Sequence, residues 1–361
     1  MRVAYLSAAN SIHTVRWVNG LARRGLDVHL ISAQARNDGI EPRVHWWPLR
    51  RRAPWAYALC ARELASQLRD IGPDLLHANY ASGYGLLARL SAFRPVLLSL
   101  WGSDVYEFPT VSPLHRWLLR GNLAAATALG STSRCMARRA ALTFDHPHVF
   151  VTPFGVDEHR FAPAAEERPA ARVVVGTVKT LAHTYGVDVL LEAFAVARRR
   201  LGAACDLRLE ITGDGPERLP LERRTGELGV SDRVTFHGAV PHDRVPALLQ
   251  RLDVFAALSR QESFGVAVLE AAACARAIVV SDADGLAEVV HDGRTGLVVR
   301  RGDPLAAADA LCRLAGDHAL REALGRAARE HVLEHYTWEH SLDLMIDAYR
   351  RVVRLHRSGP R

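Results

Sequence analysis

Short apolar segments alternate with segments of helical periodicity along this chain, and the alternation occurs in two successive series. In the first series, we predict a helix over 13–25 and strands over 2–8, 27–33, 74–79, 95–102, 126–132 and 148–155. In the second, we predict helices over 186–200, 216–228, 242–251 and 265–273, with strands over 172–178, 206–212, 233–237, 253–257 and 277–281. Short apolar strands separated by helices pair in parallel, because each crossover helix returns the chain to the same end of the sheet. The pattern therefore predicts an α/β protein with two Rossmann-like domains.

The break between the two series indicates the domain organisation. We expect an N-terminal Rossmann-like domain over 1–156, a linker over 157–171, a C-terminal Rossmann-like domain over 172–336 and a final helix over 337–361. The linker carries two prolines and many charges, and the final helix is amphipathic and ends in basic residues, as a helix C-terminus prefers. Ligands of such sheets bind beyond the carboxyl ends of the strands, so we expect the functional site in a cleft between the two domains.

The net charge of +7 is unevenly distributed. Residues 1–155 carry 18 Arg against 9 Asp and Glu, whereas residues 156–361 carry 28 Arg and Lys against 30 Asp and Glu. The segment HWWPLRRRAPWAY (45–57) combines arginine with tryptophan. Two interpretations stay open: a solvated charged face beside core tryptophans, or a contact with an anionic membrane surface, where each basic residue adds roughly 1 kcal/mol of attraction. No nucleic-acid recognition motif is present, so we expect no nucleic-acid partner.

The sequence shows no sign of membrane insertion or export. The N-terminal stretch MRVAYLSAAN reads as a buried strand and lacks the features of a signal peptide, and no apolar run approaches the length of a membrane span. The five cysteines are scattered without the paired spacing of metal ligands, which favours reduced thiols. We therefore expect a cytoplasmic protein, in which residues 45–57 are the candidate contact with the inner face of the cell membrane.

The segment from 258 to 299 carries the most specific chemical signal. Glu262 and Glu270 are separated by eight positions, and Ser263, Phe264 and Gly265 stand where the predicted helix opens. The first N–H groups of a helix have no intrahelical partner and form an anion site, and a glycine lets a phosphate approach the backbone. Eight residues at helical rise span about 12 Å. A ligand whose phosphates rest on the helix start would therefore meet one carboxylate on each side.

This segment resembles the E-x7-E region of retaining glycosyltransferases of the GT-B fold, specifically glycosyltransferase family 4. Four further stretches resemble family segments in the same order, namely VTPFGVDEHRF (151–161), EITGDGPER (210–218), RVTFHGAVPHDRVPALLQRLDVFAALS (233–259) and HDGRTGLVVRRGD (291–303). The resemblance implies a GT-B fold in which the C-terminal helix crosses back to the N-terminal domain. It also implies retaining hexosyl transfer from a nucleotide-sugar to an acceptor hydroxyl, without a metal or other cofactor.

The resemblance also implies roles for residues of the C-terminal domain. Glu270 would accept hydrogen bonds from the ribose hydroxyls, and Glu262 would face the hydroxyls of the donor sugar. Backbone amides near Phe264 and Gly265 would hold the distal phosphate, while the Phe264 ring belongs to the core. The remaining residues expected around the donor are Ser263, Thr177, Gly213, and the pair His237 and Gly238, whose loop would flank the base.

Lys179 is the single lysine of the chain, since 45 of the 46 basic Lys and Arg residues are arginine. Family 4 usually has an arginine and a lysine where this chain has Thr177 and Tyr185, so the usual cation pair is missing. We expect Lys179 to offset the charge that develops on the leaving diphosphate. Its compact ammonium suits a tight pocket that the forked guanidinium of arginine would not enter. The alternative is that one lysine survived a strong bias towards arginine.

The expected acceptor side lies in the N-terminal domain. Asn10, Ser11 and His13 fill the turn after the first strand, where the family often has a glycine pair, and His13 is the candidate catalytic group there. Trp101 lies at the end of the strand predicted at 95–102, in place of a histidine frequent in the family, and Asp104 follows that strand. The triplet DAD (282–284) matches a metal-binding form of another glycosyltransferase fold. It stands in a loop position, so we expect no metal there.

Several interpretations of the activity stay open. We expect a UDP-sugar as the donor, although base recognition in this fold relies largely on backbone groups. A lipid-linked or surface-polysaccharide glycan is the expected acceptor, and a soluble aminocyclitol or other natural product is the alternative. A sugar-nucleotide epimerase shares the architecture. A phosphorylase with pyridoxal phosphate on Lys179 and a non-catalytic nucleotide-sugar binder are further alternatives.

Overall fold

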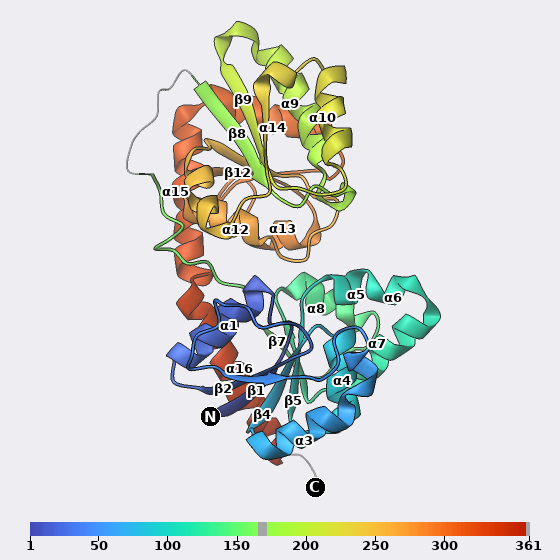
Figure 1. Cartoon of the computed structure of the whole chain (residues 1–361). Helices are drawn as coiled ribbons and strands as arrows, with labels where there is room; N and C mark the ends of the chain where they lie inside the picture. The colour runs from blue at the N-terminus through green and yellow to red at the C-terminus, as the bar shows by residue number, and fades with distance from the viewer. Residues whose placement is uncertain (165–171, 359–361) are drawn as a thin grey trace. The chain divides into compact units, whose positions relative to one another are not determined.

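Two parallel sheets, each with helices packed on it, make up the structure (Figure 1). The computed structural model describes residues 1–164 and 172–358. Its contacts divide the chain into unit 1, Met1–Pro153 with Ser341–Arg361, and unit 2, Phe154–His340. The strands of both sheets run parallel, which confirms the predicted α/β architecture with two Rossmann-like domains.

Unit 1 holds a seven-stranded sheet with the order β3-β2-β1-β4-β5-β6-β7. Its strands are β1 (Arg2–Leu6), β2 (Asp27–Ser32), β3 (His45–Pro48), β4 (Leu75–Asn79), β5 (Val96–Leu100), β6 (Ala128–Ser131) and β7 (Val149–Val151). Its helices are α1 (Ile12–Arg23), α2 (Ala56–Leu59), α3 (Ala61–Ile71), α4 (Gly83–Ser91), α5 (Ser103–Tyr106), α6 (Phe108–Val111), α7 (Pro113–Ala125), α8 (Arg134–Ala141) and most of α16 (Trp338–Ser358).

The strand β3 was not predicted from the sequence. It is a four-residue edge strand that pairs with β2; its two end residues are exposed and its two tryptophans are half-buried. The segment 45–57 therefore begins as sheet: the Trp47 Nε1 donates to the His29 Nδ1 at 3.0 Å. The indole of Trp47 is thus bound within unit 1, whereas Trp55 is 71% exposed.

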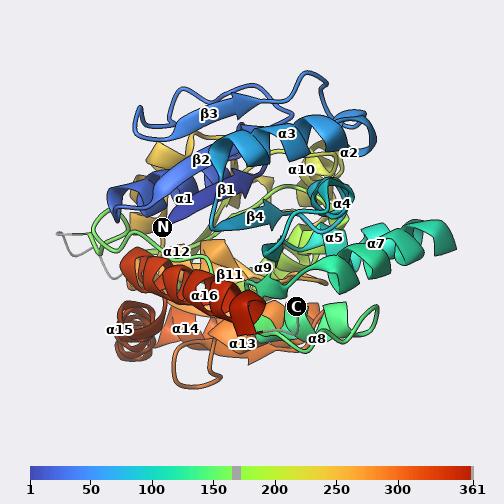
Figure 2. The ribbon, with the colours of Figure 1, turned by 90° about the horizontal axis from the view of Figure 1, so that it is seen from below.

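Helices cover both faces of the unit 1 sheet. Ala4 and Leu6 of β1 face a core to which α3, α4 and α7 contribute. The helices α1 and α16 lie on the opposite side, as Figures 1 and 2 show. On that side Tyr349 of α16 contacts His77 of β4: its hydroxyl and the His77 Nδ1 are 2.7 Å apart. The final helix is therefore anchored to the sheet of unit 1, and the last residues of the predicted 337–361 helix, 359–361, lie outside the described residues.

Unit 2 holds a six-stranded sheet with the order β10-β9-β8-β11-β12-β13. Its strands are β8 (Arg172–Val178), β9 (Asp206–Thr212), β10 (Val234–Gly238), β11 (Val254–Ala257), β12 (Ala277–Ser281) and β13 (Leu297–Val299). Its helices are α9 (Val187–Leu201), α10 (Arg218–Glu227), α11 (Val245–Gln250), α12 (Val266–Ala273), α13 (Asp284–Val289), α14 (Pro304–Gly316) and α15 (His318–His335), with 3-10 turns η1 (His183–Tyr185), η2 (Gly202–Ala204), η3 (Ser231–Arg233) and η4 (His242–Arg244).

The segment predicted as a linker begins inside unit 2. Phe161 is 2% exposed, and its carbonyl accepts a hydrogen bond from the Arg329 Nη1 at 3.2 Å. The neighbouring Ala162 carbonyl accepts one from the Gln250 Nε2 at 2.8 Å. Residues 157–164 are therefore bound to unit 2 by an apolar anchor, and residues 165–171 of the predicted linker lie outside the described residues. Over the described part of the chain, every helix is too short or too polar to cross a membrane.

Candidate functional site

The carboxyl ends of the central strands in unit 2 bring together the residues that carry the strongest sequence signal. Lys179 directly follows β8, and its N–H donates to the Thr212 carbonyl at the end of β9, at 2.9 Å. Glu262 lies between β11 and α12, and β11 pairs with both β8 and β12. A parallel sheet places these strand ends at one edge, so residues far apart in sequence become neighbours there.

Lys179 and Glu262 form an ion pair between the Lys179 Nζ and the Glu262 Oε2. The two side chains are only 17% and 11% exposed. The same Nζ lies 4.4 Å from the centre of the Tyr185 ring, within cation–π range. The ammonium of Lys179 therefore lies over the ring of Tyr185. Position 185 is the one at which family 4 usually has a lysine. Sequence analysis assigned Lys179 and Glu262 separate roles and did not predict that they pair.

A glycine without room for a side chain fixes the backbone of Lys179. Gly213 has φ +134°, and a Cβ there would lie 1.8 Å from the Lys179 carbonyl oxygen. The Gly213 N–H donates to the Gly238 carbonyl at 2.8 Å, and Gly238 itself has φ +71°. Gly213 thus acts through close backbone approach, whereas a Cβ at Gly238 would meet only the Arg218 side chain, at 3.0 Å, and that position favours glycine because of its positive φ. The two glycines place the ends of β9 and β10 against the residue that carries the cation.

Contacts of Arg260 with Asp188 and Thr184 hold the loop of Tyr185 near Glu262. Arg260 makes a bidentate pair with Asp188, with nitrogen–oxygen distances of 2.8 and 2.6 Å, and its N–H donates to the Thr184 carbonyl. Burial acts to raise the pKa of Asp188, but the Arg260 hydrogen bond and charge outweigh it and lower this pKa. A Cβ at Gly186 would lie 2.0 Å from the Leu258 carbonyl oxygen. The loop after β8 and the loop after β11 are therefore joined by the Arg260 guanidinium and by the close approach of Gly186 to Leu258.

The start of α12 is shaped by two more glycines. Gly265 caps the helix with φ +104°, and the Gly285 N–H donates to the Glu262 carbonyl at 3.0 Å. A Cβ at Gly285 would lie 2.5 Å from the Phe264 nitrogen. Phe264 is 4% exposed, so its ring is packed in the core, as predicted. Ser263 is half-buried, and Val266 and Ala267 begin the helix with partly exposed residues.

Glu270 is 5% exposed in α12, and its Oε1 accepts a hydrogen bond from the His242 Nε2 at 2.8 Å. An ionised carboxylate only accepts, so this nitrogen carries the proton. His242 stands on η4 and contacts the Phe161 ring. Sequence analysis missed it, because no spacing links position 242 to position 270. His242 holds the Glu270 carboxylate in one orientation.

Two residues predicted to lie around the donor, His237 and Thr177, have side chains that are paired or buried elsewhere. The His237 Nε2 lies 3.1 Å from the Glu210 Oε2, which also accepts from the Arg251 Nη2 at 2.9 Å. Thr177 is 3% exposed within β8. Its side chain is therefore packed inside the unit, and the site gains no exposed polar group from it.

Unit 1 has a cavity of about 260 Å³ at the carboxyl edge of its own sheet. Trp101 lines it, together with three aromatic residues that sequence analysis missed, Tyr57, Tyr80 and Tyr84. The other lining residues are Ser7, Ala8, Asn79, Ser82 and Gly83, so the lining carries no formal charge. Aromatic residues just after a strand end, as in HANYASGYG, are the signal that could have identified this cavity.

The other predicted acceptor residues lie beside that cavity and do not line it. The His13 ring, in the first turn of α1, contacts the Trp101 ring with centroids 5.9 Å apart. Asn10 is exposed and Ser11 is half-buried in the preceding turn. Asp104 is fully buried, and its carboxylate accepts from the N–H groups of Ala81 and Gly102, each at 2.8 Å. The carboxylate of Asp104 thus holds this loop in place and faces no open pocket.

One side-chain group among the described residues has the composition of a metal site. Asp27, His29 and His45 offer ligand atoms that lie within 4.8 Å of one another on β2 and β3. However, the Trp47 Nε1–H donates to the His29 Nδ1, which leaves the proton of a neutral ring on the Nε2 that faces Asp27. That tautomer opposes metal binding through Nε2. In the DAD triplet, both carboxylates pair with Arg301, at 2.9 and 3.2 Å.

Family models match both parts of the chain. The model for glycosyl transferases group 1 matches residues 158–331, and the model for glycosyl transferase 4-like proteins matches residues 2–133. The GDP-mannose-dependent alpha-(1-6)-phosphatidylinositol monomannoside mannosyltransferase of Mycolicibacterium smegmatis is 32% identical over 70% of this chain and 69% of its own length. The D-inositol 3-phosphate glycosyltransferase of Salinispora tropica is 34% identical over 59% of this chain, and this chain spans only about half, 48%, of that relative.

Solved structures share the two-domain GT-B fold. Sucrose-phosphate synthase from Thermosynechococcus elongatus superposes with a TM-score of 0.83 at 20% identity, covering 98% of this chain and 99% of the other. Anabaena HepE, solved with UDP and glucose, superposes with a TM-score of 0.78 at 17% identity, covering 97% of this chain and 100% of the other. At these identities the likeness establishes the fold.

Proposed function

Because this chain belongs to the glycosyl transferases group 1 family, we propose that it transfers a sugar from a nucleotide-sugar to an acceptor hydroxyl with retention of the anomeric configuration. The observation that carries the proposal is the convergence of Lys179, Glu262 and the start of α12 at the carboxyl edge of the unit 2 sheet. A shielded cation beside a helix start is suited to a diphosphate, and the neighbouring carboxylate is suited to sugar hydroxyls.

The donor lies along this edge in the proposed complex. Its distal phosphate rests on the backbone near Gly265, and Lys179 contacts the diphosphate from the β8 side. Glu262 holds the Lys179 ammonium and accepts hydrogen bonds from the donor sugar. Glu270, oriented by His242, accepts them from the ribose. His242 thus acts as a positioning residue for the ribose contact.

Transfer then proceeds on one face of the sugar. The bond between the anomeric carbon and the diphosphate oxygen breaks, and a bond forms from the acceptor oxygen to the same carbon. The acceptor proton passes to the departing diphosphate, so no side-chain nucleophile is needed. Lys179 and the helix amides stabilise the charge that grows on the diphosphate, and one such group contributes roughly 10²–10³ in turnover.

We propose a UDP-sugar as the donor. The HepE complex supports this in so far as the same fold accommodates UDP. GDP-mannose, named in the mycobacterial relative, is the competing donor. The proposed acceptor is a glycan whose ring enters the uncharged cavity of unit 1, where Trp101 and the tyrosines offer faces for stacking. A lipid-linked glycan remains the preferred form, and a soluble aminocyclitol is the alternative.

Contact with an anionic membrane would go through the exposed part of 45–57. Arg50, Arg51, Arg52 and Trp55 are exposed there, whereas Trp47 is bound to His29. Co-sedimentation with anionic vesicles at low salt tests this contact. Absence of binding would count against the lipid-linked acceptor and in favour of the soluble one.

The function is tested by a panel of UDP- and GDP-sugars scored by the thermal unfolding midpoint of the full chain, which a ligand of the folded state raises. The donor that raises it is then incubated with candidate acceptors, and the anomeric configuration of the product is read by NMR. We expect retention. An inverted product would refute the same-face route, and a panel without any shift or product would refute the proposed activity.

A further inference from the structure

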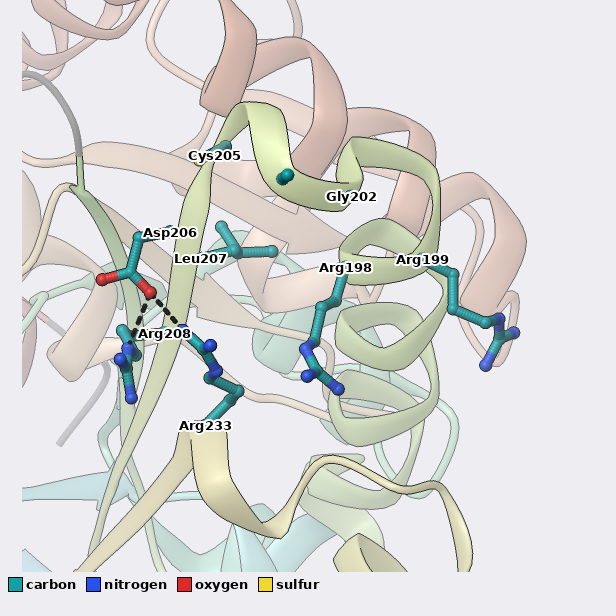
Figure 3. A pocket seen from close by; sticks show the side chains of 9 residues that line it. Arg198, Arg199, Gly202, Cys205, Asp206, Leu207, Arg208 and Arg233 are labelled. Carbon is teal, nitrogen blue, oxygen red and sulfur yellow. Dashed lines mark hydrogen bonds and ion pairs between the residues drawn. The ribbon is translucent and has the colours of Figure 1, made fainter.

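A second basic cavity lies in unit 2, away from the Lys179 site. It has a volume of about 570 Å³ and is lined by the end of α9, by η2, by the beginning of β9 and by the last residue of η3 (Figure 3). Its charged lining residues are Arg198, Arg199, Arg208 and Arg233, against Asp206 alone. A volume of this size lies within the roughly 300–1,000 Å³ range of small-molecule sites.

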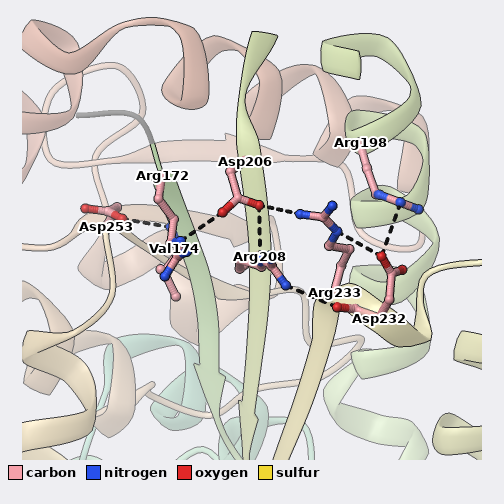
Figure 4. A network of polar contacts seen from close by, with 8 residues as sticks. All are labelled: Arg172, Val174, Arg198, Asp206, Arg208, Asp232, Arg233 and Asp253. Carbon is pink, nitrogen blue, oxygen red and sulfur yellow. Dashed lines mark hydrogen bonds and ion pairs between the residues drawn. The ribbon is translucent and has the colours of Figure 1, made fainter. Parts of the chain in front are cut away.

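The positive charge of this cavity is local, and neighbouring carboxylates offset only part of it. Arg172, Asp232 and Asp253 adjoin the lining, so the cluster sets five guanidinium groups against three carboxylates, and Figure 4 shows all of these residues except Arg199. The second part of the chain, 156–361, carries 28 basic against 30 acidic residues. A general excess of arginine on this half of the protein therefore does not explain the cavity.

Asp206 holds the guanidinium groups in place. Its carboxylate pairs with the Arg172 Nε at 2.9 Å, the Arg208 Nε at 2.9 Å, and the Arg233 Nη1. Arg233 is held a second time, because its Nε pairs with Asp232 at 2.9 Å. A guanidinium has five N–H donors, so these contacts orient the forks and leave donors for a further acceptor. Orienting contacts of this kind reduce the conformational entropy lost when an anion binds.

The helix α9 supplies the opposite wall. The Arg198 Nη1 donates to the Gly229 carbonyl at 2.9 Å. Arg199 stands exposed at the rim, and within the described residues it has no hydrogen bond or ion pair. Arg200, the next residue, pairs with Asp309 and does not line the cavity. Positive charge in a last helical turn is favourable by itself, which accounts for three arginines in sequence but not for the cavity that Arg198 and Arg199 share with Arg233.

This cavity and the Lys179 site occupy opposite ends of the same strand. β9 runs from Asp206 at the cavity to Thr212, whose carbonyl accepts from Lys179. Seven residues at about 3.3 Å per residue separate the two ends by roughly 20 Å. The lining contains no aromatic side chain on which a base could stack. The expected ligand is therefore rich in phosphate and makes no use of a nucleobase.

We propose that the cavity formed by Arg198, Arg208 and Arg233 is an anion site for a ligand that carries phosphate groups with two or more negative charges. Guanidinium forks bind phosphate oxygens in bidentate fashion, and several held at one place select for multiple charge. The phosphate can belong to a soluble polyphosphate or phosphate ester, or to a lipid headgroup. The site is independent of the sugar-transfer proposal.

The test uses inorganic tripolyphosphate as the probe and the full chain, titrated by calorimetry at low salt. The variant R198Q/R199Q removes two charges from the cavity, and R200Q removes one from the same helix outside it. We expect R198Q/R199Q to weaken tripolyphosphate binding at this site at least tenfold and R200Q to leave it unchanged. Any binding of the probe at the Lys179 site persists in both variants, because neither alters it.

Folding is checked by circular dichroism, and R199E provides a second variant, because Arg199 is exposed and supports no other described residue. We expect R199E to weaken binding several-fold. Equal isotherms for wild type, R198Q/R199Q and R199E would overturn the proposal. Vesicles of phosphatidylcholine with and without phosphatidic acid then identify the source. Sedimentation that R198Q/R199Q reduces and R200Q does not assigns the phosphate to lipid, whereas tripolyphosphate binding without this difference assigns it to a soluble ligand.

Discussion

Removing the charge of Lys179 should affect stability and diphosphate binding through different partners, and a mutant cycle separates the two. The ion pair with Glu262 is largely shielded, because the side chains are 17% and 11% exposed. Breaking a buried pair from one side destabilises by about 3–5 kcal/mol, whereas an exposed pair contributes about 0–1 kcal/mol. With this residual exposure we expect Lys179→Met to lower the free energy of unfolding by about 2 kcal/mol, between these limits.

The double variant Lys179→Met/Glu262→Gln should recover most of that loss, since no uncompensated carboxylate remains. For a domain of this size, 2 kcal/mol corresponds to a fall of about 4–8 °C in the unfolding midpoint. Binding of UDP should behave differently. A hydrogen bond to a charged group contributes about 1.5–3 kcal/mol, so both variants that lack Lys179 should bind UDP about 10–100-fold more weakly.

The assay is thermal unfolding of the four proteins of the cycle, with and without UDP, and calorimetric titration of UDP into each. Glu262→Gln alone is the matched control, because it breaks the same ion pair and keeps the cation. If Lys179→Met lowers the midpoint but binds UDP as tightly as wild type, Lys179 is a structural residue and the assigned phosphate contact is wrong. Should GDP be the nucleotide that the donor panel selects, the same cycle applies to it.

Three further predictions concern the contact between His77 and Tyr349, the pH dependence of stability, and the close approach of Gly213 to Lys179. Tyr349→Phe leaves the buried His77 ring without its hydroxyl partner, and we expect a loss of about 1–3 kcal/mol in denaturant unfolding of unit 1. Burial lowers the pKa of His77 to about 3, so between this value and the ordinary histidine range protons favour the unfolded chain. Stability should therefore fall as the pH falls through that window, by up to about 1.4 kcal/mol per pH unit, and a His77→Gln variant should show a shallower slope. Gly213→Ala places a Cβ 1.8 Å from the Lys179 carbonyl oxygen, so this variant should weaken UDP binding. Gly229→Ala is the control, because Gly229 also has a positive φ (+67°) but has open space around it, and this variant should bind UDP like wild type. Equal UDP affinities of the two variants would refute the role of the close approach at Gly213.

The order and type of the main elements could be predicted from the sequence because their signals are local. The strands predicted at 206–212 and 277–281 have the same bounds in the structure, Asp206–Thr212 and Ala277–Ser281. AIVVS (277–281) is an apolar run that is fully buried, whereas DLRLEIT (206–212) alternates polar and apolar residues and buries its apolar ones. Each is followed by a loop and then a helical period. By contrast, β3 (His45–Pro48) is a half-exposed edge strand, so burial imposes no clear pattern on its residues.

The candidate residues were predictable only one at a time. Composition singled out Lys179, and the spacing from Glu262 to Glu270 around a helix start indicated a phosphate site. The pair between Lys179 and Glu262 spans 83 positions, and the contact of His242 with Glu270 spans 28. No local pattern records such contacts. They arise because parallel strands deliver their carboxyl ends to one edge of the sheet.

The sequence by itself therefore determined the two parallel α/β domains, the family resemblance and the chemical character of the donor residues, since these depend on residue type and periodicity. Tertiary structure alone decided which charges meet. In the folded chain, Lys179 forms an ion pair with Glu262 and lies over the Tyr185 ring. Asp104 is buried there and is not accessible to a ligand. Tertiary structure also gathered four arginines from α9, β9 and η3 around one cavity. The physical reason is that a charge is defined by sequence, whereas its neighbours and its access to water are defined by how the strands and loops pack.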